Sequence, residues 1–285
     1  MPLGASMKVP TRRFRTDDGI ELVADVAGDP SAPCVVLMHG GGQTRFSWQN
    51  AMEELIEAGY RVINFDARGH GESSWAGRGG YGLKRHARDL AHITADVEGA
   101  VALVGASLGG ATALRAMADG MRPAAVVLVD IVPRPDLTGV QRIRDFMLGT
   151  PEGFRSVEEV ADAIAAYNPH RPRPTDLTGL MRNLRLREDG RLRWHWDPAF
   201  LGREIPLELA ELEATIDGAR AAGEVPVLLI RGMHSDVVRE QGLAELRSVL
   251  PRLEVHQVPE AGHMVAGDRN DAFNRGMIAF LRSHL

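Results

Sequence analysis

The sequence contains one cysteine, which excludes a protein held together by internal disulfides. Such low use of cysteine fits a reducing compartment, and we expect the protein to be cytoplasmic. Cys34 lies in the apolar stretch Cys34–Met38, where burial raises the pKa of a thiol. We therefore expect Cys34 to be a small core residue and not a nucleophile.

Long apolar runs and an excess of positive charge are also missing. No apolar stretch approaches the roughly 20 residues that a membrane-spanning helix needs. The first residues, up to Met7, lack a charged segment followed by an apolar one, so we interpret them as a mobile leader without a secretion signal. The formal net charge of −5 gives no electrostatic reason to expect nucleic acid or an anionic membrane as partner.

Metal and nucleotide motifs are absent as well. The sequence has no His-x-x-x-His or paired-cysteine spacing, no P-loop, and no Gly-x-Gly-x-x-Gly pattern that opens a helix. We therefore expect no metal and no cofactor. The expected partner is a small-molecule substrate, and a homodimer is left open.

What the sequence does contain is a regular alternation of short β-rich runs with helical patterns. Hydrophobic residues make up 44% and charged residues 25% of the chain, which is ordinary for a globular protein with a large core. The alternation is typical of a mostly parallel sheet covered by helices. The expected strands are residues 12–15, 20–26, 34–38, 61–65, 101–104, 124–129, 225–231 and 253–258. The expected helices are residues 48–58, 83–98, 107–118, 238–250 and 271–285.

Residues 133–222 depart from this alternation. Apolar residues recur there at helical spacing, as at Val140, Ile143 and Met147, and only a short strand at 192–196 is a candidate. We interpret this region as a helical insertion between two strands of one sheet. The chain then divides into a core, residues 1–132 and 223–285, and an insertion, residues 133–222.

A Gly-x-Ser-x-Gly pattern at Gly105–Gly109 lies where an apolar strand meets a helix. Small residues at its ends permit a tight turn that exposes the Ser107 hydroxyl above the carboxyl edge of the sheet. A serine at this point can also be a simple helix N-cap. The context favours a nucleophile, with the N–H of Leu108 placed to stabilise an oxyanion.

A nucleophilic serine needs a base, and the base needs an orienting acid. Asp236 and His263 follow the last two expected strands, so both should lie at the sheet edge that carries Ser107. The order Ser, Asp, His is the one expected for this type of sheet. Asp130, at the end of the strand before the insertion, is the alternative acid, and His234 is a weaker candidate for the base.

Five motifs in this order resemble the α/β-hydrolase family over almost the whole chain. They are His39-Gly40-Gly41-Gly42, Asp66-Ala67-Arg68-Gly69-His70-Gly71-Glu72-Ser73, Gly105–Gly109, Gly232…Asp236 and Gly262-His263. The resemblance implies an α/β-hydrolase fold, with a mostly parallel central sheet flanked by helices and with the insertion as a helical cap over the site.

The resemblance also assigns roles to single residues. It implies Gly41 N–H as the second oxyanion donor, His39 in the oxyanion loop and His70 in a structural turn, which Asp66 and Arg68 stabilise. Some members of the family place the acid where Asp130 stands, but the Gly232…Asp236 loop matches the common pattern, so we favour Asp236.

The cap should supply an apolar ceiling to the site. The candidate substrate-binding residues are Trp48, Met147, Trp194 and Trp196, with Phe146 and Met181 as further candidates. For each of them, ordinary packing within the cap is the alternative. The arginines between residues 182 and 193 are interpreted as a solvated face.

These features predict a serine hydrolase of the ester-cleaving type. The leading hypothesis is hydrolysis of a carboxylic ester or lactone of a small, largely apolar molecule through an acyl-enzyme. Ser107 in place of an aspartate disfavours the haloalkane dehalogenase and epoxide hydrolase branches. The alternatives are a carbon–carbon bond hydrolase of ring-cleavage diketones, a cofactor-free perhydrolase resembling haloperoxidases, and a slow-turnover ligand-sensing protein.

Overall fold

The main sheet of the protein has eight strands in the part of the chain that the structure describes. That part, in this computed structural model, is residues 9–169, 173, 175–221, 223–263 and 270–285, so the predicted leader up to Met7 lies outside it. The strand order is β1-β2-β4-β3-β5-β6-β9-β10. The strands are β1 (Thr11–Arg15), β2 (Glu21–Ala27), β3 (Cys34–Met38), β4 (Arg61–Phe65), β5 (Val101–Ala106), β6 (Ala125–Val129), β9 (Val227–Gly232) and β10 (Glu254–Val258).

Most neighbouring strands are parallel, as the alternation of strands and helices predicts. β2 pairs antiparallel with β1 and β4, and the pairs from β4 through β10 are all parallel. The helices of the core are α1 (Gln49–Glu57), α2 (Leu83–Thr94), α3 (Leu108–Ala118), α8 (Glu240–Val249) and α10 (Asn270–His284). The prediction of a mostly parallel sheet flanked by helices is confirmed.

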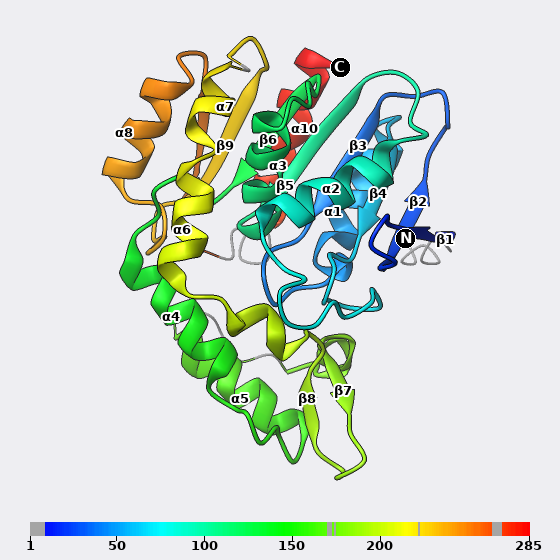
Figure 1. Cartoon of the computed structure of the whole chain (residues 1–285), viewed down its shortest axis with the longest axis vertical. Helices are drawn as coiled ribbons and strands as arrows, with labels where there is room; N and C mark the ends of the chain where they lie inside the picture. The colour runs from blue at the N-terminus through cyan, green and yellow to red at the C-terminus, as the bar shows by residue number, and fades with distance from the viewer. Residues whose placement is uncertain (1–8, 170–172, 174, 222, 264–269) are drawn as a thin grey trace.

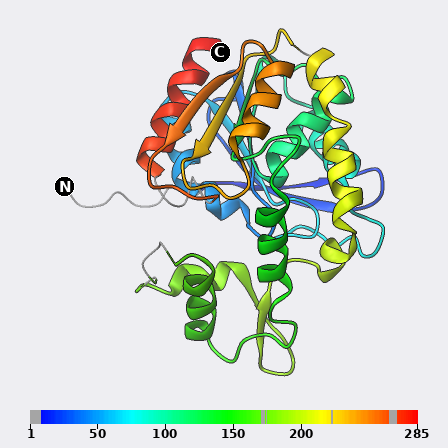
Figure 2. The same cartoon turned by 90° about the vertical axis from the view of Figure 1, so that its left-hand side faces the viewer.

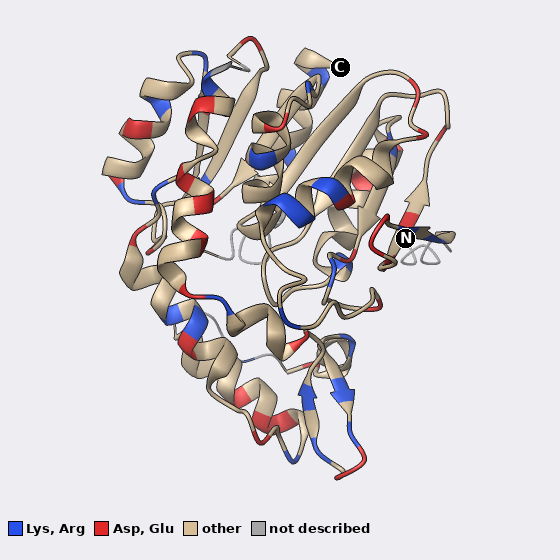
Figure 3. Ribbon diagram, viewed as in Figure 1, with Lys and Arg blue, Asp and Glu red and all other residues tan. Residues whose placement is uncertain are grey.

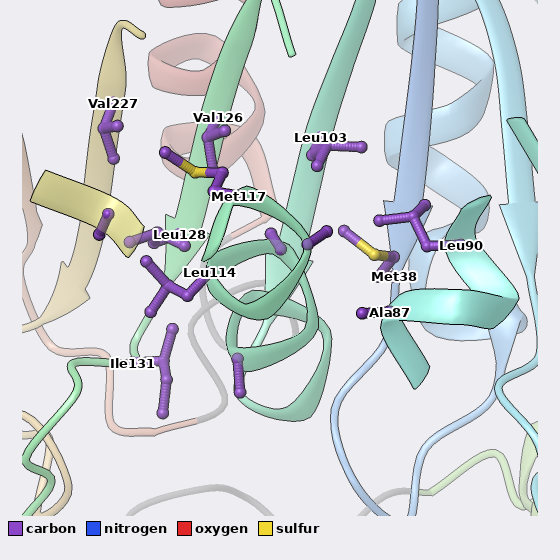
Figure 4. Close-up of a cluster of buried hydrophobic side chains, with 14 of the residues drawn as sticks. Met38, Ala87, Leu90, Leu103, Leu114, Met117, Val126, Leu128, Ile131 and Val227 are labelled. Carbon is purple, nitrogen blue, oxygen red and sulfur yellow. The ribbon is translucent and has the colours of Figure 1, made fainter. Parts of the chain in front are cut away.

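Helices cover both faces of this sheet, and Figure 2 shows the layers from the side. Side chains alternate along each strand, so Val36 and Met38 face one layer while Val35 and Leu37 face the other. On the first face they pack with α2 and α3, through residues such as Leu90, Leu114 and Met117 (Figure 4). On the second face they pack with α1 and α10. Cys34 is fully buried, as expected, and burial raises the pKa of its thiol to about 11.

The insertion extends from one end of the sheet, as Figure 1 shows. Its elements are α4 (Leu137–Leu148), α5 (Val157–Tyr167), η2 (Thr178–Asn183), β7 (Leu184–Leu186), β8 (Leu192–Trp194), η3 (Pro198–Gly202), α6 (Ile205–Glu213) and α7 (Ile216–Ala221). The first part, α4 to β8, forms a lobe below the core. Leu212 of α6 and Ala219 of α7 instead join the buried cluster of the core that includes Leu114 of α3.

Two glycines bring α3 into direct contact with the sheet. A Cβ added to Gly109 would lie 2.3 Å from the Met38 carbonyl oxygen, and one added to Gly105 would lie 2.3 Å from the carbonyl carbon of Gly109. Both neighbours are backbone atoms, which cannot move aside as a flexible side chain can. Glycine is therefore required at both positions by packing.

We predict that Gly109→Ala lowers the free energy of unfolding by about 1–3 kcal/mol or more, the usual cost of overpacking a core. Urea denaturation measures this change. The matched control is Gly179→Ala, because a Cβ at Gly179 meets nothing within 4 Å; it should change stability by less than about 0.5 kcal/mol. Equal stability of the two variants would contradict the packing argument.

Candidate active site

Ser107 occupies the sharp turn between β5 and α3 that the sequence predicts. Its φ of 44° and ψ of −106° lie outside the regions that non-glycine residues normally adopt. The turn is held by hydrogen bonds from Ser107 N–H to the Val129 carbonyl, 3.0 Å, and from Ala111 N–H to the Ser107 carbonyl, 2.9 Å. The Ser107 side chain makes no capping hydrogen bond, so the N-cap alternative is not realised. Backbone strain of this kind collects at functional sites.

The imidazole of His263 is paired with Asp130. His263 Nδ1 lies 2.7 Å from Asp130 Oδ2, and Asp130 is completely buried at the end of β6. His263 and Ser107 line the same cavity. The prediction that Asp236 orients His263 is therefore wrong, and the alternative acid, Asp130, occupies that position.

The loop after β9 holds the Asp130 carboxylate in place. Gly232 N–H donates to Asp130 Oδ1 over 3.2 Å, and the Ser235 hydroxyl donates to Asp130 Oδ2 over 2.5 Å. Asp130 itself has a φ of 49°, so its backbone turns sharply where β6 ends. Together with His263, these donors compensate the loss of hydration that a buried carboxylate suffers.

Asp236 instead links the cap to the core. Its Oδ2 lies 2.7 Å from Arg142 Nη1 of α4, and its side chain is 26% exposed. Arg142 also donates to the carbonyl of Tyr167 at the end of α5. His234, the weaker candidate for the base, is exposed and is not among the cavity-lining residues.

The glycine loop after β3 lies beside Ser107. A Cβ on Gly40 would be 3.5 Å from Ser107 Cβ, and Gly41 and Leu108 line the cavity together with Ser107. Gly40 N–H donates to Gln43 Oε1 over 2.9 Å, and Gly42 N–H donates to His70 Nε2 over 3.1 Å. Gly41 N–H donates to no group among the described residues, so it is available to a ligand.

Three buried histidines, His39, His70 and His195, hydrogen-bond to this loop, and a fourth, His86, lies against Phe200; sequence reasoning did not group them. Burial lowers the pKa of His39 to about 4, of His70 and His86 to about 3, and of His195 to about 2. All four are therefore neutral at physiological pH. His39 begins the glycine loop after β3, and its Nε2 accepts a hydrogen bond from Ala67 N–H over 2.9 Å.

The turn at residues 66–73 is held by buried carboxylates and arginines. Asp66 accepts from the N–H of Arg45 over 2.7 Å and of Glu72 over 3.0 Å. Arg68 makes two hydrogen bonds to Asp89, at 2.7 and 2.6 Å. These contacts give Asp66 and Arg68 the structural role expected for them.

A cavity of about 940 Å³ opens above Ser107 between cap and core. The expected substrate-binding residues Trp48, Met147, Trp194 and Trp196 all line it, as does Phe146. Met181 does not line the cavity and is 46% exposed. Two ion pairs lie in the wall, Arg203 with Glu211 at 2.8 Å and Arg144 with Glu208 at 3.5 Å, and Arg173 of the wall pairs with Asp162 at 2.6 Å.

The arginines of the β7–β8 hairpin lie apart from this cavity. Figure 3 shows them along the outer edge of the cap. Arg193 pairs with Asp189 at 2.7 Å, and the Arg185 and Arg187 guanidinium groups lie over the Trp75 ring. Arg185 also donates to the Gly71 carbonyl, and burial lowers the pKa of its guanidinium, so the interpretation as a solvated face does not hold for Arg185.

Among the residues that the structure describes, no group of three or more His, Cys, Asp or Glu side chains could hold a metal ion. No helix in the described ranges is long and apolar enough to cross a membrane.

Comparison with known proteins gives matches over most of the chain. The sequence model of the alpha/beta hydrolase family matches residues 35–275. Esterase Rv0045c of Mycobacterium tuberculosis is 32% identical over 249 residues, which are 84% of this chain and 79% of that protein. The 3-hydroxybutyrate-oligomer hydrolase of Cupriavidus necator is 29% identical over 83% of this chain and 84% of its own.

Solved structures of other proteins have the same fold as this chain. A crystal structure of esterase Rv0045c superposes with a TM-score of 0.72 at 28% identity, covering 98% of this chain and 92% of that one. The structure of E-2-(acetamidomethylene)succinate hydrolase has a TM-score of 0.82 at 24% identity, covering 96% of this chain and 99% of that one.

We predict that the protein loses stability as the pH falls below about 6.5, the ordinary pKa of histidine. Between that pH and the lowered folded-state pKa values, the unfolded chain binds protons at His39, His70, His86 and His195 that the folded protein does not bind. Stability is therefore complete above about pH 6.5, and each histidine removes up to about 1.4 kcal/mol per pH unit below it.

Urea denaturation between pH 8 and pH 5 measures this slope. His86→Leu should make the slope shallower, because it removes one of the groups that titrate only in the unfolded state. His234→Gln, at an exposed histidine, serves as the control and should leave the slope unchanged. A stability that is constant down to pH 5 would refute the burial argument.

Proposed function

Because the chain belongs to the α/β-hydrolase family and is a carboxylic ester hydrolase, we propose that Ser107, His263 and Asp130 form its catalytic triad. We further propose small, largely apolar carboxylic esters or lactones as its substrates. The observation that carries the triad is the 2.7 Å contact between His263 Nδ1 and the buried carboxylate of Asp130, in the wall of the cavity that Ser107 also lines.

The reaction begins with transfer of the Ser107 proton to His263 Nε2 as Oγ attacks the ester carbonyl carbon. Asp130 accepts a hydrogen bond from His263 Nδ1–H, which fixes the neutral tautomer with its lone pair on Nε2 and stabilises the imidazolium once it forms. Collapse of the tetrahedral intermediate breaks the bond to the alcohol oxygen, which takes the proton from His263. Water, activated by His263 in the same way, then releases the carboxylic acid and restores Ser107.

The negative charge of the tetrahedral intermediate falls on the former carbonyl oxygen. Gly41 N–H and Leu108 N–H are the proposed donors to that oxygen, because both residues line the cavity at Ser107. Leu108 is the first residue of α3, so its N–H belongs to the helix start, where backbone donors lack partners within the helix. Each such donor is worth about 3 kcal/mol to the transition state in comparable sites.

The cavity supports an apolar substrate. Its wall consists mainly of aliphatic and aromatic side chains, among them Trp48, Met147, Trp194 and Trp196, which we propose as substrate-binding residues. Trp194 and Trp196 stack with their ring centres 5.0 Å apart, and Phe146 packs on Trp194 at 5.7 Å. Burial of hydrocarbon against such a surface stabilises the bound state by about 25 cal/mol per Å² of apolar area removed from water.

We predict that Ser107→Ala abolishes hydrolysis of short and medium p-nitrophenyl esters and labelling by a fluorophosphonate probe. The physical reason is that no other hydroxyl occupies the strained turn beside Gly41 and Leu108. Peptide mapping of the labelled wild-type protein should place the probe on Ser107. Undiminished ester turnover by Ser107→Ala would contradict the proposal, as would strong cleavage of a ring-cleavage diketone beside only background ester turnover.

We predict that Asp130→Asn lowers kcat about 10³- to 10⁴-fold, because an amide donates a hydrogen bond and favours the wrong histidine tautomer. Asp236→Asn is the matched control. It removes a partly exposed ion pair with Arg142, and pairs of that kind contribute about 0–1 kcal/mol. Its kcat should stay within about threefold of the wild type, which corresponds to less than 1 kcal/mol.

Steady-state kinetics on one p-nitrophenyl ester compares the two variants. The opposite ranking, with Asp236→Asn inactive and Asp130→Asn active, would show that the acid is Asp236.

A further inference from the structure

We propose that His195 of the cap, together with His70, positions the oxyanion loop, so that a cap residue controls the rate of the chemical step. The proposal rests on the proposed function, because it concerns the loop that presents Gly41 N–H to the substrate. His195 follows β8 and is 2% exposed. Nothing in the resemblance to the family assigns it a role.

The contacts of the His195 ring define its tautomer. Gly71 N–H donates to His195 Nδ1 over 2.7 Å, so Nδ1 carries the lone pair. The proton of the neutral ring is then on Nε2, which lies 3.3 Å from the Gly42 carbonyl oxygen. His195 therefore donates to the oxyanion loop at one end of its ring and accepts from the turn at Gly71 at the other.

His70 holds the other backbone group of the same glycine. Gly42 N–H donates to His70 Nε2 over 3.1 Å, and His70 Nδ1 lies 3.1 Å from the Arg68 carbonyl oxygen. His70 thus has the opposite tautomer, with its proton on Nδ1. The two rings lie 5.8 Å apart, and between them they bind both the N–H and the C=O of Gly42.

Fixing Gly42 on both sides fixes the peptide that joins it to Gly41. Gly42 has a φ of 76°, which is a left-handed conformation. Glycine adopts this conformation readily but can adopt others as well, so the hydrogen bonds to His70 and His195 are needed to select it. On the other side of Gly41, Gly40 N–H is held by Gln43 Oε1 over 2.9 Å. Gly41 N–H belongs to the peptide that joins Gly40 to Gly41, and the carbonyl oxygen of that peptide accepts from Gln43 N–H over 3.0 Å and lies 2.8 Å from His39 Nδ1. These bonds, together with those of Gly42 on the other side of Gly41, set the direction of the Gly41 N–H.

The cap segment that carries His195 is itself hydrogen-bonded to the core. Trp75 Nε1 donates to the His195 carbonyl over 3.3 Å, and Asp197 N–H donates to the Gly69 carbonyl over 2.8 Å. Asp197, two residues on, accepts from the Tyr81 hydroxyl over 2.6 Å and from Gly77 N–H over 3.0 Å. The position of Gly42 is thereby coupled to the position of the cap.

Two amide variants of His195 separate its two contacts. In His195→Gln, the side-chain N–H₂ reaches the place of Nε2 and keeps the donor to Gly42. In His195→Asn, the side-chain oxygen takes the place of Nδ1 and keeps only the acceptor for Gly71. We expect His195→Asn to lose about tenfold or more in kcat, a part of the 10²- to 10³-fold that removal of a whole oxyanion donor costs. His195→Gln should keep more than about a third of the wild-type kcat.

A positioning role also predicts which kinetic constants change in the His195 variants. KM of a p-nitrophenyl ester should stay within about threefold in both variants, because the loop acts on the developing oxyanion and not on the bound ester. The inhibition constant of a trifluoromethyl ketone, which forms an oxyanion on Ser107, should rise in His195→Asn in step with the fall in kcat/KM. Thermal melts of both variants show whether they are folded at the assay temperature.

Equal kcat in the two His195 variants, with both folded and labelled by fluorophosphonate, would overturn the positioning role and leave the triad intact. Failure of the wild type to label or to cleave esters would instead overturn the proposed function. If the His195 variants do not fold, the reciprocal pair at His70 decides. There, His70→Gln keeps the acceptor for Gly42 N–H and should stay active, whereas His70→Asn keeps only the donor to Arg68 and should lose kcat. Equal activity or equal loss in that pair also overturns the proposal.

Discussion

The backbone of helix α3 is in direct contact with the backbone of the sheet, and this contact fixes the positions of the other parts of the site. Gly109 meets the carbonyl of Met38 at the end of β3, which places Ser107 above the end of β5. β5 lies between β3 and β6, so the glycine loop after β3 and Asp130 after β6 flank Ser107. β9 and β10 come next in the sheet, and the segments that follow them bring Ser235 and His263 to Asp130. The order of the strands thus determines which side chains can meet.

Much of this arrangement is predictable from the sequence, because apolar runs, glycines and strand ends carry local information. The turn at Ser107 and the placement of His263 follow from such signals. The acid does not, because Asp130 and Asp236 follow neighbouring strands and reach the same edge. The discriminating signal is the surrounding composition: Asp130 interrupts an apolar run from Ala124 to Val132, so it must be buried and paired. The loop containing Asp236 matches a family pattern, yet it serves to hold Asp130 through Ser235.

The insertion shows a different limit of sequence reasoning. Its helical character is visible in the spacing of apolar residues, but that spacing does not say which surface a helix covers. Gly218 of α7 approaches α3 so closely that an added Cβ would lie 2.1 Å from the Ala118 Cα. The end of the insertion therefore packs as part of the core layer, while α4 and α5 cover the cavity. The contacts of His195 join residues more than 120 positions apart, and no local pattern encodes them.

Neutral imidazole is suited to holding the oxyanion loop for an electrostatic reason. Each ring offers one donor and one acceptor, so His70 and His195 can satisfy a backbone N–H and a backbone C=O without bringing a net charge. A lysine or arginine at these positions would bring a cation into a buried site and would offer no lone pair to the N–H of Gly42 or Gly71. An aspartate or glutamate would repel the oxyanion. Burial lowers the pKa of His70 to about 3 and of His195 to about 2, which keeps both rings neutral while the proposed base, His263, gains and loses its proton.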